Sequence, residues 1–338
     1  MKTRLVIIQG GTNTEHEISL ISAKGILANL NRRKYQVKVL TITQDNRWVD
    51  EQGRGVDPFS LPTFADLVFP ILHGPYGEDG TIQGLLELLR LPYVGCGVTA
   101  SAVCMDKVLQ KNVCQSYSIP LVPYFWFTRR EWDHDQEQVL KSLSQKFPST
   151  NFPLFVKPAN QGSSVGITKA HHQTELISGI ETALIRDTKV VVEIAVSDVR
   201  EIECAVLDPN DSPQASVLGE IIPDREFYDY SAKYADSQSQ AIIPAQLSKK
   251  LTEQIQSVAI KAFRVLDCYG LARLDFLVNG ATSEFYLNEV NTMPGFTPIS
   301  MYPKLWEATG LAYSDLLDRL IELAFARFRE KSALNLIH

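Results

Sequence analysis

Apolar residues recur with two different periods along the first hundred residues. Residues 5–8 form a short apolar run typical of a buried strand, whereas residues 17–30 place Leu20, Ala23, Leu27 and Leu30 at helical spacing. Similar patterns predict strands at 35–43 and 67–72, a helix at 81–90 and a further strand beginning at 93. This strand–helix alternation predicts a parallel sheet covered by helices.

The rest of the chain mixes helices with more widely spaced strands. Helices are expected at 102–117, 129–146, 251–266 and 315–329, the last with Ser314 as its N-cap, and strands at 122–127, 152–158, 190–194, 201–207, 272–278 and 285–291. Residues 160–166 are small, polar and rich in glycine, which predicts a mobile loop. Residues 223–244 lack apolar periodicity, which is typical of a functional lid or a disordered linker. We expect three domains, at 1–101, 102–189 and 190–338.

The composition excludes several classes of protein. Of 338 residues, 45% are hydrophobic and 21% are charged, so the chain can bury a large core and is neither disordered nor fibrous. A net charge of -6 argues against a general binder of nucleic acid or other polyanions. No apolar run approaches the roughly 18–20 residues that cross a bilayer, and the apolar start is too short for a signal peptide. We therefore expect no membrane association.

The cysteines and histidines indicate neither disulfides nor zinc. Cys96, Cys104, Cys114, Cys204 and Cys268 are odd in number, and no two of them form a C-x-x-C pair. We expect buried free thiols in a reducing cytoplasm. The six histidines show no spacing typical of a zinc site.

Polar side chains gather on the last two predicted strands. Because side chains alternate between the faces of a strand, one face of the first strand carries Arg273, Asp275 and Leu277, and one face of the second carries Phe285, Leu287, Glu289 and Asn291. A hairpin through Asn279-Gly280 would bring Asp275 to Glu289 and Asn291. Two carboxylates and an amide oxygen suit Mg²⁺ that bridges phosphates, and Arg273 suits a phosphate. The alternative is a solvated face with scattered charges.

Four segments that follow predicted strands could approach a ligand. The glycine of 291–295 could donate its N–H to a developing oxyanion, or belong to an ordinary Pro-Gly turn. Backbone N–H groups of 162–166 could cradle phosphates beside Lys157, or form a surface turn. Glu15 could bind an ammonium group, or simply favour the start of a helix. His73 opens a glycine-rich turn at 73–80. A G-x-G-x-x-A match at 95–100 is a weak sign of a dinucleotide site.

Together these segments resemble the D-alanine–D-alanine ligases of the ATP-grasp superfamily. The resemblance extends from Gly10 to beyond Met301 and rests on seven ordered motifs: GGTNTEHEISL, HGPYGEDGTIQG, MDK, VKPANQGSSVGI, EFYDYSAKY, GLARLDF and NEVNTMPGFTPIS. It implies an α/β (α+β) ATP-grasp fold of three domains, with an N-terminal Rossmann-like domain of parallel sheet, a central lid domain and a C-terminal catalytic domain that carries an omega-type loop at 223–244. It also implies a cytoplasmic enzyme of peptidoglycan synthesis, and a homodimer.

The resemblance assigns roles to particular residues. For ATP binding it implies Lys107, Lys157, Ser164, Glu193, Ile194, Val196, Glu201, Phe276 and Asn288, with the two lysines on phosphates and the two glutamates on adenine and ribose. Asp275, Glu289 and Asn291 would bind two Mg²⁺ (or Mn²⁺) ions. For catalysis it implies Glu15, Ser163, Tyr234, Arg273 and Gly295, and for substrate binding His73, Lys233, Ser300 and Met301. The partners that the resemblance implies are therefore two D-alanine molecules and ATP.

The implied reaction joins two D-alanine molecules through an acyl phosphate. Relatives that make D-alanyl-D-lactate lose the tyrosine equivalent to Tyr234 or remodel its loop, so the presence of Lys233 and Tyr234 favours an amine acceptor. Ser231 and Met301 depart from the residues common in the family, which leaves open a changed acceptor such as D-serine or D-lactate. A catalytically silent nucleotide-binding protein is the alternative from another class, since folds are reused as scaffolds.

Overall fold

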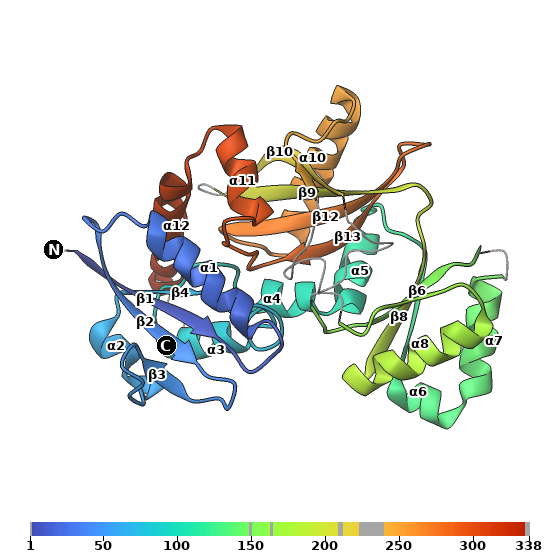
Figure 1. The fold of residues 1–338 in the computed structure, drawn as a ribbon, viewed down its shortest axis with the longest axis horizontal. Helices are drawn as coiled ribbons and strands as arrows, with labels where there is room; N and C mark the ends of the chain where they lie inside the picture. Colours follow the sequence, from blue (N-terminus) through green and yellow to red (C-terminus); the bar gives the residue numbers. More distant parts are fainter. Residues whose placement is uncertain (1, 149–150, 163–164, 209–211, 223–239, 335–338) are drawn as a thin grey trace.

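The computed structural model describes residues 2–148, 151–162, 165–208, 212–222 and 240–334. Its strands form three sheets, and helices pack against each of them (Figure 1). In Figure 1 the N-terminal sheet lies at the left, the sheet built from the last strands at the top, and the sheet around β8 at the right. None of the helices in these ranges is long and apolar enough to cross a membrane.

The N-terminal sheet has the strand order β3-β2-β1-β4. Strands β1 (Thr3–Gly10), β2 (Tyr35–Ile42) and β4 (Leu67–Pro70) are parallel, and helices α1 (His16–Asn29) and α3 (Thr81–Leu88) follow β1 and β4, which confirms the predicted alternation. Three short elements were not predicted because residues 45–63 carry no periodic pattern: β3 (Trp48–Asp50), η1 (Pro58–Ser60) and α2 (Leu61–Phe64).

The sheet in the middle of the chain is antiparallel, with the order β5-β8-β6-β7. Its strands are β5 (Tyr124–Thr128), β6 (Leu154–Pro158), β7 (Thr168–Ala170) and β8 (Lys189–Ile194), and its helices are α6 (Arg129–His134), α7 (Gln136–Lys146) and α8 (Gln173–Arg186). We expected β8 in the third section of the chain, but it hydrogen-bonds to β5 and β6. The three domain boundaries themselves stay a prediction.

Two predicted long helices are each divided in two. Helix α4 (Val98–Met105) ends before Asp106, whose carboxylate accepts hydrogen bonds from the first N–H groups of α5 (Lys107–Ser116). Asp135 separates α6 from α7 in the same way and caps α7. An aspartate at an N-cap satisfies backbone donors that a continuous helix would bond internally, so each acid starts a new helix.

The third sheet has the order β11-β10-β9-β12-β13. Its strands are β9 (Val199–Leu207), β10 (Gln214–Ile222), β11 (Gln240–Ile242), β12 (Leu271–Asn279) and β13 (Phe285–Asn291), and its helices are α10 (Lys249–Val265), α11 (Met301–Thr309) and α12 (Tyr313–Ala333). The predicted cap of the last helix is wrong: α12 begins after Ala312, without a side-chain cap, so Ser314 lies inside its first turn.

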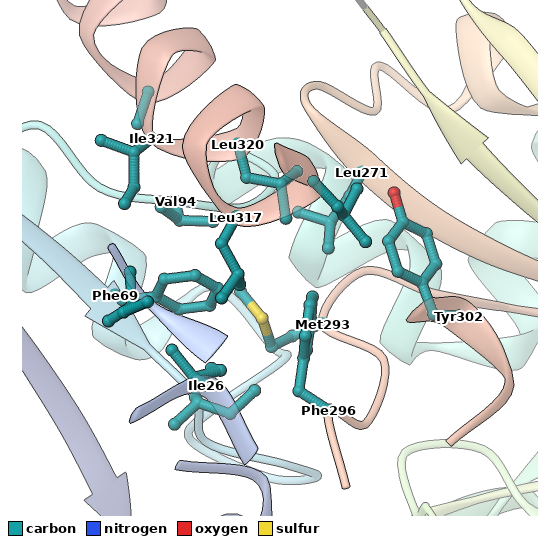
Figure 2. Packing of buried hydrophobic residues seen from close by; sticks show 14 of the residues in the cluster. Ile26, Phe69, Val94, Leu271, Met293, Phe296, Tyr302, Leu317, Leu320 and Ile321 are labelled. Atoms are coloured by element: carbon teal, nitrogen blue, oxygen red, sulfur yellow. The ribbon is translucent and has the colours of Figure 1, made fainter. Parts of the chain in front are cut away.

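One apolar core joins the N-terminal sheet to the third sheet. It contains residues of α1 and β4, such as Ile26 and Phe69, together with Leu271 of β12 and Leu317 of α12. Figure 2 shows the side chains of Met293 and Phe296, from the segment after β13, inserted into this core. The two sheets therefore pack against each other through one core, and apolar contacts fix the segment that carries Met293 and Phe296.

The five cysteines are buried and free, as predicted. The Sγ atoms of Cys104 and Cys268 lie 4.0 Å apart, within reach of a hydrogen bond and without a disulfide. Cys96, in the G-x-G-x-x-A segment, lies in a hydrogen-bonding position toward the carbonyl of Leu271, 3.3 Å away. This segment packs against the start of β12, as an ordinary buried turn does.

Candidate active site

Strands β12 and β13 pair as the predicted antiparallel hairpin. Asp275 lies opposite Glu289, and Arg273 lies opposite Asn291. On the other side of β12, Asp275 lies opposite Glu203 of β9. Three carboxylates from three adjacent strands thus lie in one row, and the convergence expected from the alternation of side chains is confirmed.

The alternation fails at one point on β13. A β-bulge places Asp275 opposite Glu289 but the next residue, Phe276, opposite Leu287, so Asn288 is the extra residue. Leu287 is buried in the core beside Phe276, and it does not share the face of Glu289 as simple alternation predicted. Asn288 instead lines a pocket together with Asp275 and Glu289. There its Oδ1 accepts a hydrogen bond from Lys157 Nζ at 3.2 Å.

Arg273 is held between two carboxylates. Its Nε lies 3.1 Å from Glu203 Oε2, and its terminal nitrogen lies 2.7 Å from Asp275 Oδ2. Burial alone would lower the pKa of Arg273, but Asp275 and Glu203 raise it well above its usual range. The guanidinium therefore stays charged and keeps a fixed orientation in the pocket.

The residues predicted to bind metal suit a hard divalent cation. Asp275 and Glu289 supply carboxylate oxygens, and Asn291 donates its Nδ2 to Asp275 at 3.0 Å, which leaves its Oδ1 as a ligand atom. Within the described ranges, no three His, Cys, Asp or Glu side chains are placed so that they alone could hold a metal ion. An open set of two carboxylates and one amide suits Mg²⁺, which completes its shell with water and phosphate oxygens.

A first pocket lies between the middle sheet and the third sheet. It is lined by most of the residues predicted to bind ATP: Lys107, Lys157, Glu193, Ile194, Val196, Glu201, Phe276 and Asn288. Asp275 and Glu289 lie at the same pocket. The predicted ATP residues in the described ranges and two of the predicted metal ligands therefore surround one space.

Glu193 connects two lysines beneath this pocket. Its carboxylate lies 2.6 Å from Lys157 Nζ and 2.7 Å from Lys111 Nζ, and all three side chains are at most one-tenth exposed. Burial would raise the pKa of Glu193, but Lys111 and Lys157 lower it to about 2. The carboxylate thus holds Lys157 in place, and direct contact of Glu193 with adenine stays a prediction.

This buried triad predicts a specific loss of stability. In Glu193→Gln, two buried ammonium groups lose their counter-charge, so we expect the free energy of unfolding to fall by about 3–5 kcal/mol in urea titrations. Because the folded-state pKa of Glu193 is lowered to about 2, its contribution is present above about pH 4.5 and is lost as the pH falls toward 2.

The free energies of unfolding of wild type and Glu193→Gln should therefore differ less in acid. Wild type should lose stability between about pH 4.5 and pH 2 more steeply than Glu193→Gln does, and Glu181→Gln, at an exposed helical position, serves as the control. An equal loss in wild type and Glu193→Gln would contradict the role of the triad.

A second pocket adjoins the first. It is lined by Glu15, His73, Glu78, Cys104, Arg273, Gly295, Ser300 and Met301, among others. Four residues line both pockets: Lys107, Gln161, Glu203 and Glu289. The two spaces therefore meet beside the row of carboxylates, which is where a ligand in one pocket could react with a ligand in the other.

Glu15 forms one wall of the second pocket because a glycine leaves room for it. A Cβ atom on Gly74 would lie 2.0 Å from Glu15 Oε2, and Gly74 has a φ of +67° that favours glycine. Asn13 fixes the loop, since its Oδ1 accepts from the N–H of Glu15 and its Nδ2 donates to the carbonyl of His73. A carboxylate held here suits an ammonium group.

The other predicted residues of this pocket differ in their surroundings. Both ring nitrogens of His73 are occupied, one by Ser22 and the other by the carbonyl of Met293. Ser300 precedes α11 and accepts a hydrogen bond from the N–H of Thr297 at 2.9 Å. Met301 is 4% exposed and lies mainly in the core. Their roles in substrate binding stay predictions.

Four predicted residues lie outside the described ranges: Ser163, Ser164, Lys233 and Tyr234. Conversely, our prediction omitted Glu78, Lys111, Gln161 and Glu203, which lie at the two pockets or touch their residues. Glu203 could have been found because it follows Glu201 at the spacing of one strand face. Lys111 shows no such signal, since only the fold brings it to Glu193.

Comparisons with known proteins agree over nearly the whole chain. The family described as "D-ala D-ala ligase C-terminus" matches residues 113–322, and "D-ala D-ala ligase N-terminus" matches residues 4–60 and 51–96. The chain is 45% identical to a D-alanine–D-alanine ligase of Acetivibrio thermocellus, with 97% of each chain covered. It is 44% identical to the corresponding ligase of Clostridium novyi, over 97% of this chain and 99% of that one.

Solved structures show the same similarity in three dimensions. The D-alanine-D-alanine ligase of Coxiella burnetii matches with a TM-score of 0.84 and 39% identity, over 98% of this chain and 96% of that one. The VanG D-Ala:D-Ser ligase of Enterococcus faecalis matches with a TM-score of 0.84 and 34% identity, over 96% and 100%. The Bacillus anthracis ligase complexed with ATP matches with a TM-score of 0.78 and 29% identity, over 97% and 99%. The chain therefore belongs to the D-alanine–D-alanine ligase family and has its ATP-grasp fold.

Proposed function

We propose that this protein joins two molecules of D-alanine into D-alanyl-D-alanine, a precursor of peptidoglycan, with conversion of ATP into ADP and phosphate. Membership of the ligase family supports the activity. The observation that carries the proposal is the meeting of two pockets at Lys107, Gln161, Glu203 and Glu289, beside Arg273. A nucleotide in one pocket and an amino acid in the other would place a γ-phosphate against a carboxylate.

The reaction has two steps. In the first, a carboxylate oxygen of the first D-alanine attacks the γ-phosphorus, the bond to the β,γ-bridging oxygen breaks, and ADP leaves. In the second, the amine of the second D-alanine attacks the acyl carbon of D-alanyl phosphate, and the bond from that carbon to the phosphate oxygen breaks. The attacking amine loses a proton to reach the neutral amide. The first step brings a carboxylate against an anionic phosphate, and the second develops negative charge on the carbonyl oxygen, so the site must neutralise both charges.

The chain's own residues divide this work. Lys107 and Lys157 bind phosphate oxygens in the first pocket, and Glu15 holds the ammonium group of the first D-alanine in the second. Arg273 and the N–H of Gly295 stabilise the oxyanion of the tetrahedral intermediate. Ser163, Ser164, Lys233 and Tyr234 lie outside the described residues, and in this proposal they keep the roles that the resemblance implies.

We assign two Mg²⁺ (or Mn²⁺) ions to Asp275, Glu289 and Asn291. Such ions, when bound, neutralise phosphate charge and polarise the γ-phosphorus. The side chains of the protein fix where the positive charge of the ions would lie. Arg273 orients Asp275, and Asp275 orients the amide of Asn291. The resemblance to the family further supports a homodimer in the cytoplasm as part of this proposal.

A phosphate-release assay tests the function. Purified protein with ATP and Mg²⁺ should release phosphate only when D-alanine is present, and mass spectrometry should identify D-alanyl-D-alanine. Folded protein that releases no phosphate under these conditions would refute the proposal.

The acceptor can be tested in the same assay. A 34% identical relative is a D-Ala:D-Ser ligase, and Ser231 and Met301 differ from the residues common in the family. With D-alanine, D-serine and D-lactate in competition, we expect D-alanyl-D-alanine as the main product by mass. A dominant mixed product would assign the chain to a ligase with another acceptor.

A further inference from the structure

The turn that carries Gly295 is held at both ends by hydrogen bonds. At its start, the N–H of Met293 donates to Glu78 Oε1 at 3.3 Å, and the carbonyl of Met293 lies 3.1 Å from His73 Nδ1. At its end, the N–H of Phe296 donates to Ser22 Oγ at 3.2 Å, and the carbonyl of Phe296 accepts from Tyr313 Oη at 2.7 Å. Four side chains thus bind the four backbone groups that flank Pro294 and Gly295.

Three of these side chains come from the N-terminal part of the chain, and two of them, His73 and Ser22, are hydrogen-bonded to each other. His73 Nδ1 faces a carbonyl oxygen, which only accepts, so Nδ1 carries the proton of a neutral ring. Its Nε2 then accepts from the hydroxyl of Ser22, 3.0 Å away, and Ser22 in turn accepts from Phe296. Burial lowers the pKa of His73 to about 4, which agrees with a neutral ring.

Glu78 links the same turn to the predicted ammonium site. Its Oε2 accepts from the N–H of Gly74 at 2.7 Å, and Gly74 lies directly beneath the carboxylate of Glu15. Glu78 therefore bridges the backbone below Glu15 and the backbone before Gly295. Burial, with the charge of Glu15 as a further cause, raises the pKa of Glu78 to about 8. At neutral pH the side chain is therefore mostly uncharged and acts through its hydrogen bonds.

Packing reinforces these hydrogen bonds. Met293 and Phe296 are 2% and 0% exposed, and Phe296 contacts Phe69 edge to face with ring centres 5.7 Å apart (Figure 2). A Cβ atom on Gly25 of α1 would lie 2.1 Å from the carbonyl oxygen of Phe296, so the helix and the turn are in direct contact. The turn is therefore fixed against the N-terminal sheet as well as against its own strand.

We propose that Ser22, His73 and Glu78 are positioning residues, which fix the turn 293–296 so that the N–H of Gly295 points at the developing oxyanion. This inference rests on the proposed function, because it assigns these residues to the second step of that reaction. It makes His73 a support of the turn through both ring nitrogens, which differs from the predicted contact with substrate. It also connects the site of the first ammonium group to the oxyanion donor through Glu78.

The proposal predicts that variants of these residues slow the second step of the reaction and leave the first step nearly unchanged. Removal of one oxyanion donor costs about 10²–10³ in kcat, and we expect Ser22→Ala and Glu78→Gln, which only loosen the donor, to lower kcat for dipeptide formation by about tenfold to hundredfold. In Ser22→Ala the KM values for ATP and for the first D-alanine should stay within about threefold, because ground-state binding does not need the turn. Formation of the acyl phosphate should be nearly unchanged.

Positional isotope exchange measures that first step by itself. ATP labelled with ¹⁸O in the β,γ-bridge is incubated with D-alanine, and movement of the label into the non-bridging positions of the β-phosphate reports reversible cleavage. Ser101→Ala is the matched control, since Ser101 is a buried serine whose hydroxyl has no hydrogen-bond partner in the described part of the chain. It should keep both rates.

The outcomes distinguish a failure of this inference from a failure of the proposed function on which it rests. Retained isotope exchange with slowed dipeptide formation in Ser22→Ala and Glu78→Gln supports the positioning role. A parallel loss of both rates, or rates equal to those of Ser101→Ala, overturns it while the wild-type enzyme still makes dipeptide. A wild-type enzyme that makes no dipeptide overturns the proposed function, and this inference with it.

Discussion

Replacement of Asp275 by asparagine is expected to lower kcat by about 10³ or more, with the fold retained. Asp275 lies at the centre of the row formed with Glu203 and Glu289, and in our proposal it holds the divalent cations. Such a cation contributes several kcal/mol of charge stabilisation in the transition state, and each 1.36 kcal/mol is a factor of about ten in rate. The measurement is phosphate release from ATP in the presence of D-alanine, at saturating Mg²⁺.

A control on the same hairpin separates this effect from damage to the sheet. Glu284→Gln changes an exposed carboxylate at the hairpin turn and should keep full activity. The free energy of unfolding of Asp275→Asn should fall by less than about 2 kcal/mol, because Arg273 keeps its contact with Glu203. Wild-type activity in Asp275→Asn would remove the metal assignment.

Replacement of Arg273 by lysine is expected to lower kcat by about 10²–10³ although the positive charge is kept. The planar guanidinium of Arg273 contacts Asp275 and Glu203 at once, at 2.7 and 3.1 Å. A lysine ammonium is a point charge on a flexible stem and cannot satisfy both carboxylates while it faces an oxyanion. Steady-state kinetics should show the loss mainly in kcat, with a smaller change in KM for D-alanine.

Arg200→Lys gives the matched control for this substitution. Arg200 also contacts a carboxylate with two nitrogens, at 2.7 and 2.6 Å from Glu220, and it lies on the same sheet but does not line either pocket. We expect nearly normal turnover in Arg200→Lys. Similar turnover in Arg273→Lys and Arg200→Lys would show that the planar guanidinium of Arg273 has no special role.

The part of the site built on the last two strands could be predicted because it depends on local rules. The alternation of β12 places Arg273 and Asp275 on one face, and a hairpin register then brings Glu289 and Asn291 to them. The β-bulge at Asn288 could not be predicted in this way, because a bulge depends on how the partner strand packs, which alternation alone does not encode. For that reason the prediction placed Leu287 on the wrong face.

Contacts between distant segments were the hardest to predict. The lysine pair around Glu193 combines residues from α5, β6 and β8, and nothing in the spacing of Lys111 points to it. Likewise, the bonds of Glu78 and His73 to Met293 join segments more than 200 residues apart. Edge strands such as β7 and β11 have three residues each, too few for a periodic pattern.

The central claim is that the row of oxygen ligands on the hairpin binds the divalent cations of a nucleotide. A crystal of the protein with Mn²⁺ and a non-hydrolysable ATP analogue, measured at the manganese absorption edge, tests it most directly. We predict anomalous density within coordination distance of Asp275, Glu289 and Asn291, and between them and the analogue's phosphates. Manganese bound elsewhere, or an analogue bound with no metal at these three side chains, would contradict the claim.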